Sequence, residues 1–453
     1  MNLTADRVAE ATGGTILRGA GSVFTSYAID SRKVHAGALF FALRGTVTDG
    51  HLYVRAAAEA GATGALVEEP TEAPPALTLI QVADSLHALQ ALATAVRNGS
   101  RARFIGITGS AGKTSTKEFT AALLSAKYRV YKSEGNLNSI TGLPLSLLAM
   151  EEPECAVFEL GMSEPGEMAG LAALLQPHIR VLLNVNPVHL GQFPSVDAIA
   201  DEKCSLLKGI SSEDVILYNA DDPRLTERVA RFDALRCSYG FSPGTDLQIA
   251  DVRSEGVHGQ AAVLSWQGSS RSFRTALCGR GNLYNIAAAC CAALVCGVSW
   301  TDIIPGIEAL RPYTQRGLLI PCGGFDVYDD SYNSNPAALK FALELSSESR
   351  GYRRMVAVLG DMLELGPREA EFHQDAGRTA ARLGFQVLIT AGRLGRILGQ
   401  AAREEGLPEV HEAEDSLQAA RIAGELVREG DLVLVKGSRG VKMEVVVNAL
   451  RQR

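Results

Sequence analysis

Residues 104–118 carry the pattern that points most directly to chemistry. Their sequence, FIGITGSAGKTSTKE, passes from an apolar, β-branched run into a loop with two glycines and then into a stretch compatible with a helix. The glycines let the backbone approach a ligand, so amides of the loop and of the first helical turn can donate to phosphate oxygens. Lys113 supplies a positive charge for the β- and γ-phosphates, and the Thr114 hydroxyl can bind Mg²⁺. We therefore predict an ATP site formed by Thr108, Gly109, Ser110, Ala111, Gly112, Lys113, Thr114 and Ser115.

One position departs from the usual phosphate-binding loop. The common pattern has a glycine five residues before the glycine of Gly-Lys-Thr, whereas this chain has Ile107 there. A shorter Thr-Gly-x-x-Gly-Lys-Thr loop remains. The alternative is a glycine-rich turn between a strand and a helix that binds nothing, but such a turn has no use for Lys113 and Thr114.

Two further side chains are predicted to lie near this loop. Residues 155–161 (CAVFELG) read as a central, buried strand that Glu159 interrupts, and His189 follows the apolar strand of residues 180–186. In open α/β sheets ligands collect at the carboxyl ends of the strands, where both residues fall. A carboxylate among apolar residues is unfavourable unless it meets a cation, so Glu159 favours magnesium over a structural salt bridge. His189 is either a functional residue or a hydrogen-bonded corner.

The length of 453 residues exceeds what one hydrophobic core usually serves, and we expect three α/β domains. Residues 1–99 predict a small N-terminal α/β domain. Residues 100–312 alternate strand and helix, which is typical of a mostly parallel sheet covered on both faces, here carrying the phosphate-binding loop. Residues 313–453 alternate more regularly and predict a Rossmann-like, doubly wound domain, with a hinge near residue 313.

Composition narrows the class of protein. The net charge of −7 argues against broad nucleic-acid binding, so an anionic ligand must be held by local donors and Mg²⁺. The eight cysteines show no metal-binding spacing and predict buried thiols in a reducing cytosol. No secretory leader and no apolar run of 18 residues occurs, so we expect a cytoplasmic protein without membrane insertion.

Polar loops in the first domain could hold a substrate. Ser31 and Arg32 precede an apolar strand that ends at Gly45, and Asp49 and His51 follow it. This group could bind a nucleotide or a sugar diphosphate, or it could be the polar end of a hairpin.

The other two domains carry similar loops. Asn138 and Thr141 lie in a small-residue loop whose donors suit a diphosphate or a sugar, although an ordinary turn has the same composition. Asn282 and Asn285 open a small-residue helix, either near the nucleotide or as helix caps. In the last domain, residues 360–362, His373 and residues 436–439 could receive a substrate that bears a carboxylate. By spacing alone, Lys203 in the helix of residues 195–209 is predicted to be solvated.

Taken in order, the motifs of the whole chain resemble those of the Mur ligases. They are Thr-Gly-Ser-Ala-Gly-Lys-Thr (108–114), the Glu159 strand, Asn-Pro-Val-His-Leu (186–190), Gly-Arg-Gly-Asn-Leu-Tyr-Asn-Ile-Ala-Ala (279–288) and Asp-Asp-Ser-Tyr-Asn-Ser-Asn-Pro (329–336). Residues 30–51, 138–148 and 359–366 are most similar to members that add D-alanyl-D-alanine. The resemblance implies that ATP activates the carboxylate of UDP-N-acetylmuramoyl-tripeptide as an acyl phosphate, and that the amine of the dipeptide captures it. A monomer is expected, with the last domain closing over the site.

The resemblance also implies roles for individual residues. Catalytic roles fall to Lys113, Glu159, His189 and Lys203. Mg²⁺, with two sites expected, would be held by Thr114, Glu159, His189 and Lys203, the last as a carbamate. The nucleotide would contact Asn282, Arg316 and Asp330. The substrates would contact Ser31, Arg32, Gly45, Asp49, His51, Asn138, Thr141, Asn333, Asn335, Lys436, Ser438 and Arg439.

Two alternatives remain open at this point. One is a related ligase that adds a single amino acid, such as the diaminopimelate- or lysine-adding enzyme or a folylpolyglutamate synthetase. The other is a P-loop kinase or a nucleotide-operated binding protein. Nothing in the residues distinguishes lysine from diaminopimelate in the acceptor peptide.

Overall fold

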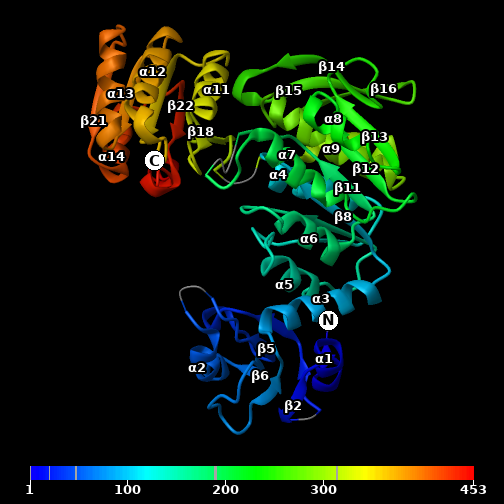
Figure 1. Cartoon of the computed structure of the whole chain (residues 1–453). Coiled ribbons are helices and arrows are strands. Elements are labelled where there is room, and N and C mark those ends of the chain that lie inside the picture. Colours follow the sequence, from blue (N-terminus) through cyan, green and yellow to red (C-terminus); the bar gives the residue numbers. More distant parts are fainter. Residues whose placement is uncertain (1, 20, 46–47, 188–190, 313–314) are drawn as a thin grey trace. The chain divides into compact units, whose positions relative to one another are not determined.

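The computed structural model describes residues 2–19, 21–45, 48–187, 191–312 and 315–453 (Figure 1). Contacts between residues divide the chain into two compact units. The first comprises Met1–Ile249, Ser265–Gly268 and Tyr284–Ile303, and the second comprises Ala250–Leu264, Ser269–Leu283 and Ile304–Arg453. The predicted hinge near residue 313 falls at positions outside the described residues.

The first unit begins with a five-stranded sheet of order β2-β7-β6-β5-β4, in which β2 alone runs antiparallel to its neighbour. The strands are β2 (Thr15–Arg18), β4 (Ser26–Ala28), β5 (Ala38–Phe41), β6 (Ala62–Val67) and β7 (Thr78–Gln81), and β1 (Leu3–Thr4) pairs with β3 (Val23–Phe24). The helices are α1 (Ala5–Thr12), α2 (Val54–Glu59) and α3 (Ser85–Gly99). Thr4 caps α1 by accepting the Arg7 N–H, and Gly13 ends it at φ 65°, a left-handed conformation that favours glycine.

The central part of the chain is built around a parallel sheet. Its strands are β8 (Arg103–Thr108), β9 (Val130–Lys132), β10 (Cys155–Glu159), β11 (Ile179–Leu182), β12 (Val215–Asn219), β13 (Leu235–Gly240) and β14 (Leu247–Ser254). They belong to a nine-stranded sheet of order β16-β15-β14-β13-β12-β11-β8-β10-β9, in which every neighbouring pair from β9 to β14 is parallel. Strands β15 (Gln260–Trp266) and β16 (Ser269–Thr275) follow along the chain. The mostly parallel sheet predicted for this part of the chain is therefore confirmed.

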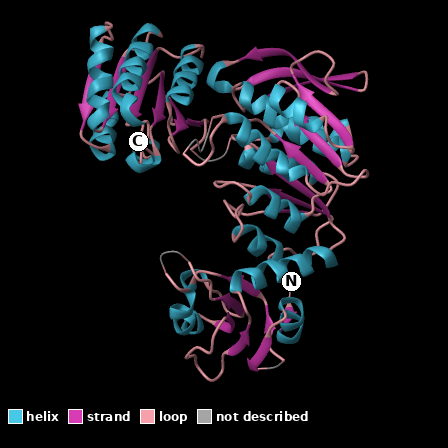
Figure 2. Ribbon diagram, in the orientation of Figure 1, coloured by secondary structure: helices cyan, strands magenta, loops and turns pink. Residues whose placement is uncertain are grey.

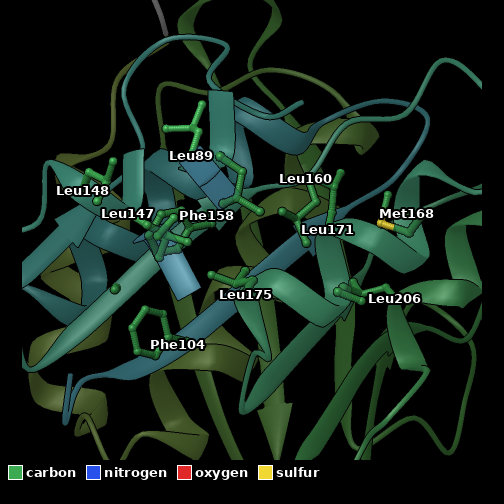
Figure 3. Packing of buried hydrophobic residues seen from close by; sticks show 14 of the residues in the cluster. Leu89, Phe104, Leu147, Leu148, Phe158, Leu160, Met168, Leu171, Leu175 and Leu206 are labelled. Carbon is green, nitrogen blue, oxygen red and sulfur yellow. The ribbon is translucent and has the colours of Figure 1, made fainter. Parts of the chain in front are cut away.

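Helices bury the apolar residues of this sheet. They are α4 (Lys113–Leu124), α5 (Gly142–Leu148), α6 (Glu167–Leu175), α7 (Val196–Cys204), α8 (Pro223–Val229), α9 (Arg280–Val295) and α10 (Trp300–Ala309). Figure 3 shows part of the core, where Phe104 of β8 and Phe158 of β10 lie among leucines of α3, α5 and α6. The two phenylalanine rings stack with their centroids 6.1 Å apart. This packing fixes the two strands that carry the phosphate-binding loop and Glu159.

The second unit contains a doubly wound sheet of order β17-β18-β22-β19-β20-β21, parallel except for β17 (Figure 2). The strands are β17 (Leu318–Pro321), β18 (Asp326–Asp330), β19 (Arg354–Gly360), β20 (Val387–Ala391), β21 (Glu409–Ala413) and β22 (Asp431–Lys436). One core cluster contains residues of α11 (Pro336–Ser347), α12 (Glu369–Arg382) and α13 (Arg393–Glu404). A separate cluster contains residues of α14 (Ser416–Leu426) and α15 (Glu444–Arg451), so helices cover both faces of the sheet as predicted.

Two details of the sequence-based description need correction or completion. The Glu159 strand, predicted to be central, lies second from the edge between β8 and β9, although all five of its residues are buried. All eight cysteines are free thiols, seven of them buried, in agreement with the interpretation from composition.

Candidate active site

The phosphate-binding loop connects β8 to α4. Gly112 is the residue before α4 and has φ 83° and ψ −4°, which favours glycine. A Cβ atom at this position would lie 2.3 Å from Oδ1 of Asn285, whose side chain also accepts a hydrogen bond from the Thr116 hydroxyl at 3.2 Å. Glycine is therefore required at residue 112 both for its conformation and for the close approach of α9.

Ile107, the position where the usual loop has glycine, lies inside β8. It is paired with Glu159 of β10 on one side and with Val181 of β11 on the other. A buried central strand position favours a β-branched residue, so the turn begins only at Gly109. The loop is therefore short because Ile107 belongs to strand β8 and not to the loop.

Glu159 and Thr114 meet at the carboxyl ends of β8 and β10. The Thr114 hydroxyl donates to Oε2 of Glu159 at 2.8 Å, and the Asn138 amide donates to Oε1 at 2.7 Å. Glu159 is buried, with 4% of its surface exposed. Among the described residues its carboxylate has two side-chain hydrogen-bond donors and forms no salt bridge, and its metal role stays a prediction. A hydroxyl and a carboxylate are oxygen ligands of the kind that Mg²⁺ takes together with nucleotide phosphates.

Two lysines lie in the same electrostatic environment. Lys113 donates from Nζ to the Gly109 carbonyl at 2.9 Å, and burial lowers its pKa while the nearby Glu159 charge raises it. Burial, together with the charge of Lys113, lowers the pKa of Lys203 to about 7. Lys203 is only 3% exposed, so the prediction of a solvated lysine is wrong. The helix pattern could not show this, because the burial comes from the way α7 packs in the fold.

Two amides of the loop are already used inside the protein. The Ser110 N–H donates to the Asn184 carbonyl at 3.0 Å, and the Ala111 N–H donates to Oδ1 of Asn184 at 2.9 Å. In this structure the amides of Ser110 and Ala111 therefore have internal acceptors, and the contact of the loop amides with phosphate stays a prediction. The sequence interpretation missed Asn184, although a polar residue just after the apolar run of β11 was a signal of the kind used for Glu159.

The predicted substrate loops of the first domain form a network of internal contacts. Arg32 is fully exposed and donates twice to the carboxylate of Asp30, which holds the pKa of Asp30 at about 2. In His51, Nδ1 lies 2.6 Å from Oδ1 of Asp49 and Nε2 accepts the Glu68 N–H at 2.9 Å. Both ring nitrogens are used, so His51 orients the Asp49 loop rather than presenting a ring nitrogen to solvent.

Three other residues predicted to contact substrate belong to the first compact unit. Gly45 is exposed and Ser31 is half-buried at the start of a short 3₁₀ helix (Ser31–Lys33). The Thr141 hydroxyl lies 3.3 Å from the Ser139 hydroxyl. Their contact with a ligand stays a prediction.

In the second unit, Lys436 brings two predicted residues together. It is 2% exposed and donates from Nζ to the carboxylate of Asp330 at 2.5 Å and to the Asn333 carbonyl at 3.0 Å. Burial raises the pKa of Asp330, against the lowering effect of Lys436. Arg316 and Arg439 lie over the ring of Tyr332, with guanidinium carbons 4.2 and 5.7 Å from its centroid.

Other predicted residues of this unit have structural partners. Asn335 caps α11 by accepting the Ala338 N–H at 2.9 Å. Ser438 is 4% exposed and its hydroxyl accepts the Leu363 N–H at 2.8 Å. The interpretation of His373 as part of a cluster open to a substrate is wrong. His373 is completely buried, Nε2 accepts the Met362 N–H at 3.0 Å, and Nδ1 lies 2.6 Å from the Glu369 carbonyl.

The remaining candidates are the asparagines of α9 and His189. The Asn282 amide donates to the Cys278 carbonyl, which precedes α9, at 2.9 Å, and its contact with the nucleotide stays a prediction. Asn285, one turn later, contacts the phosphate-binding loop. His189 lies outside the described residues. Within the described ranges, no group of three or more His, Cys, Asp or Glu side chains could hold a metal by itself, and no helix is long and apolar enough to cross a membrane.

Comparisons with known proteins cover nearly the whole chain. Residues 23–112 match the family model described as Mur ligase family, catalytic domain, residues 107–293 match Mur ligase middle domain, and residues 316–439 match Mur ligase, glutamate ligase domain. UDP-N-acetylmuramoyl-tripeptide–D-alanyl-D-alanine ligase of Bacillus subtilis is 34% identical over 458 residues, covering 99% of this chain and 98% of the relative. The Escherichia coli enzyme of the same name is 31% identical, covering 96% of each chain.

Solved structures give the same result. A crystal structure of MurF from Acinetobacter baumannii superimposes with a TM-score of 0.92 at 28% identity and covers 100% of this chain and 99% of its own. MurF ligase from Thermotoga maritima in complex with ADP has a TM-score of 0.79 at 28% identity, with coverage of 94% and 97%. Folylpolyglutamate synthase from Thermotoga maritima, at 14% identity and a TM-score of 0.60, shares the fold alone.

Proposed function

The chain belongs to the Mur ligase family, and on that premise we propose that it is the ATP-dependent ligase that adds D-alanyl-D-alanine to UDP-N-acetylmuramoyl-tripeptide. The observation that carries the proposal is the meeting of Lys113, Thr114 and Glu159 where β8 and β10 end. Relatives that carry this reaction in their names match over the full length, whereas the single-amino-acid ligases among the solved structures share only the fold. A kinase would leave the full-length similarity unexplained.

The proposed chemistry proceeds in two steps. A carboxylate oxygen of the tripeptide attacks the γ-phosphorus of ATP, the bond to the bridging oxygen of ADP breaks, and an acyl phosphate forms. The amine of the dipeptide then attacks the acyl carbon, a tetrahedral intermediate forms, and inorganic phosphate leaves as the amine loses a proton. A free carboxylate is a poor acyl donor, and the first step makes it a good one.

The main barrier in the first step is repulsion between two anions. Lys113 would leave the Gly109 carbonyl, to which it donates at 2.9 Å, and pair with the β- and γ-phosphates. Thr114, Glu159, His189 and the carbamate on Lys203 would hold Mg²⁺ at two sites, with Glu159 and His189 serving an ion that also touches the acyl phosphate. When bound, Mg²⁺ offsets the phosphate charge. Asn138 holds one carboxylate oxygen of Glu159, so we propose that it orients the carboxylate in addition to its predicted contact with substrate.

Lys203 is proposed to carry a carbamate. A neutral amine attacks CO₂, forming a C–N bond and releasing one proton, and the pKa of about 7 leaves Lys203 neutral in a large fraction of molecules at neutral pH. Incubation with ¹³C-bicarbonate should give a carbamate signal in the ¹³C NMR spectrum of the wild type and none in Lys203→Ala. The variant should be inactive, and added bicarbonate should not restore activity. Full activity of Lys203→Ala would remove Lys203 from the mechanism.

The assignment of substrates to parts of the chain is also a proposal. Residues 1–99 would bind the UDP end of the first substrate, residues 100–312 would bind ATP, and residues 313–453 would receive the dipeptide and close over the site. The nucleotide would contact Asn282, Arg316 and Asp330. Peptide and sugar contacts are proposed for the loop residues named from the sequence, including Lys436 and Arg439, whose cationic groups suit a carboxylate.

Cytoplasmic location and a monomeric state complete the proposal. The eight free thiols suit a reducing compartment, and both ATP and UDP-linked substrates are intracellular metabolites. Size-exclusion chromatography with light scattering should give a mass near 48.1 kDa.

The decisive assay follows ADP release. Turnover should require UDP-N-acetylmuramoyl-tripeptide and D-alanyl-D-alanine together. Release of ADP without an amine would indicate a kinase or an ATPase, and use of a single amino acid would indicate another ligase of the family. Lys113→Ala should abolish turnover, while Lys340→Ala, which removes an exposed lysine paired only with Glu344, should not. Native turnover in Lys113→Ala would overturn the proposal.

A further inference from the structure

The Ala111 peptide of the phosphate-binding loop is held by the side-chain amide of Asn184. Oδ1 of Asn184 accepts the Ala111 N–H at 2.9 Å, and Nδ2 donates to the Ala111 carbonyl at 3.0 Å. Because the two bonds engage both polar groups of that residue, they fix the direction in which the loop turns. A single hydrogen bond would leave the loop free to rotate about it.

The neighbouring residues join the same two segments. The Ser110 N–H donates to the Asn184 carbonyl at 3.0 Å, and the Ser110 hydroxyl accepts the Asn186 N–H at 2.9 Å. Gly109 lies so close to the segment after β11 that an added Cβ would be 2.7 Å from Cβ of Leu183. The segment after β11 therefore holds residues 109–111 in position by hydrogen bonds and close packing.

These contacts determine which backbone amides of the loop can donate to a phosphate. The amides of Ser110 and Ala111 are used by Asn184, and the first hydrogen bond within α4 runs from the Thr116 N–H to the Gly112 carbonyl. The N–H groups of residues 112–115 precede that bond and are the ones left to donate to an anion. Their direction follows from the turn at Ala111, since that residue leads directly into Gly112.

We propose that Asn184 is a positioning residue of the nucleotide site, which orients the short phosphate-binding loop so that the first amides of α4 point at the phosphates. The proposal rests on the proposed function. It accounts for the missing glycine: where Ile107 is used in the sheet, a side chain from the next strand shapes the loop instead. Asn184 acts through the backbone of Ala111 and needs no contact with ATP.

The test compares two variants of Asn184 with a matched control. Asn184→Ala removes both side-chain bonds to Ala111. Asn184→Asp keeps an acceptor for the Ala111 N–H but turns an oxygen toward the Ala111 carbonyl and adds a negative charge near the phosphates. Asn219→Ala removes a buried amide at the end of the neighbouring strand β12, where the side-chain oxygen accepts the Asp221 N–H at 3.0 Å.

MgADP affinity by calorimetry, and the KM values of the ligation reaction, are the measurements. Asn184→Ala should weaken MgADP binding and raise the KM for ATP by roughly 10- to 100-fold, while the KM for D-alanyl-D-alanine stays unchanged. Asn184→Asp should bind MgADP more weakly still. Asn219→Ala should bind MgADP as the wild type does, even where its melting temperature falls.

Three results would overturn the proposal. The first is wild-type MgADP affinity in Asn184→Ala, and the second is an equal loss of MgADP affinity in Asn219→Ala. The third is failure of both Asn184 variants to fold while Asn219→Ala folds, since Asn184 would then be required for folding. The wild type is measured in the same series. Absence of MgADP binding to the wild type would contradict the proposed function, whereas equal binding by wild type and Asn184→Ala contradicts the role of Asn184 alone.

Discussion

Replacement of Gly112 by alanine tests the geometry of the nucleotide site, and replacement of Gly166 in the same unit serves as the control. Gly112 and Gly166 both precede a helix in a left-handed conformation, with φ 83° before α4 and φ 93° before α6. An L-residue in this conformation is unfavourable by about 1–2 kcal/mol. That strain is common to Gly112→Ala and Gly166→Ala.

Only Gly112→Ala also produces a collision. The new Cβ would lie 2.3 Å from Oδ1 of Asn285 and 3.1 Å from its Cγ, whereas nothing lies within 4 Å of a Cβ at Gly166. Asn285 is 7% exposed and accepts the Thr116 hydroxyl, so moving it leaves a buried polar group without its partner. Such a loss typically amounts to about 1–3 kcal/mol. The expected loss of unfolding free energy is therefore about 1–2 kcal/mol for Gly166→Ala and about 2–5 kcal/mol for Gly112→Ala.

Urea unfolding followed by circular dichroism, with MgADP calorimetry on the folded variants, measures both effects. Gly112→Ala should also lose MgADP affinity because the first turn of α4 shifts, and Gly166→Ala should retain it. In the double variant Gly112→Ala/Asn285→Ala the colliding atoms are gone, so its loss of stability should be smaller than the sum of the single losses. Equal losses in the two glycine variants, or strict additivity in the double variant, would refute the reasoning.

Three further predictions concern buried polar groups. The pKa of Lys203 falls from 10.5 to about 7 on folding, so the unfolded chain binds more protons between these values and the free energy of unfolding should rise with pH across that window. Lys203→Met in bicarbonate-free buffer should lack this rise. A pH profile of the variant parallel to that of the wild type would contradict the burial of the amine. His51→Ala should lose about 1–3 kcal/mol of stability and raise the KM for the UDP-linked substrate, whereas an unchanged KM would separate His51 from that site. Lys436→Met should lose about 3 kcal/mol because the partly buried carboxylate of Asp330 is left without its cation. Lys436→Met/Asp330→Asn should recover part of this in the same urea assay, and no recovery would count against the ion pair.

Local patterns were sufficient for much of the fold. In the second unit, the strand candidates that the sequence offers at 353–360, 385–391, 409–413 and 431–437 coincide with the strands Arg354–Gly360, Val387–Ala391, Glu409–Ala413 and Asp431–Lys436. Strands β19, β20 and β22 are largely buried and read as apolar runs, whereas β21 is a partly exposed edge strand with Glu409, His411 and Glu412. The strand-loop-helix pattern of residues 104–118 was equally local, and its elements lie where they were predicted.

Contacts between distant segments could not be predicted in this way. Asn184 lies 73 positions from Ala111, and Asn285 lies 169 positions from Thr116. An asparagine at a strand end or in a first helical turn suits a cap as well as a contact, and only the packing of β11 and α9 against the loop decides between them. The burial of Lys203 has the same origin, since its helix pattern is compatible with a solvated face. The site is thus determined by tertiary neighbours, and the sequence identified its motif but not the residues that shape it.

The charge balance explains why these neighbours matter. A chain with a net charge of −7 binds a nucleotide without a general positive field, so local donors must overcome the repulsion. In the structure the side-chain donors of Lys113 and Thr114 have internal partners: Lys113 donates to the Gly109 carbonyl and Thr114 donates to Glu159. For these two side chains, nucleotide binding therefore exchanges one hydrogen bond for another, while the amides of residues 112–115 gain an acceptor. Asn184, which holds the Ala111 backbone, and Asn285, which packs against Gly112 and accepts the Thr116 hydroxyl, should therefore affect nucleotide affinity as strongly as residues that touch the phosphates.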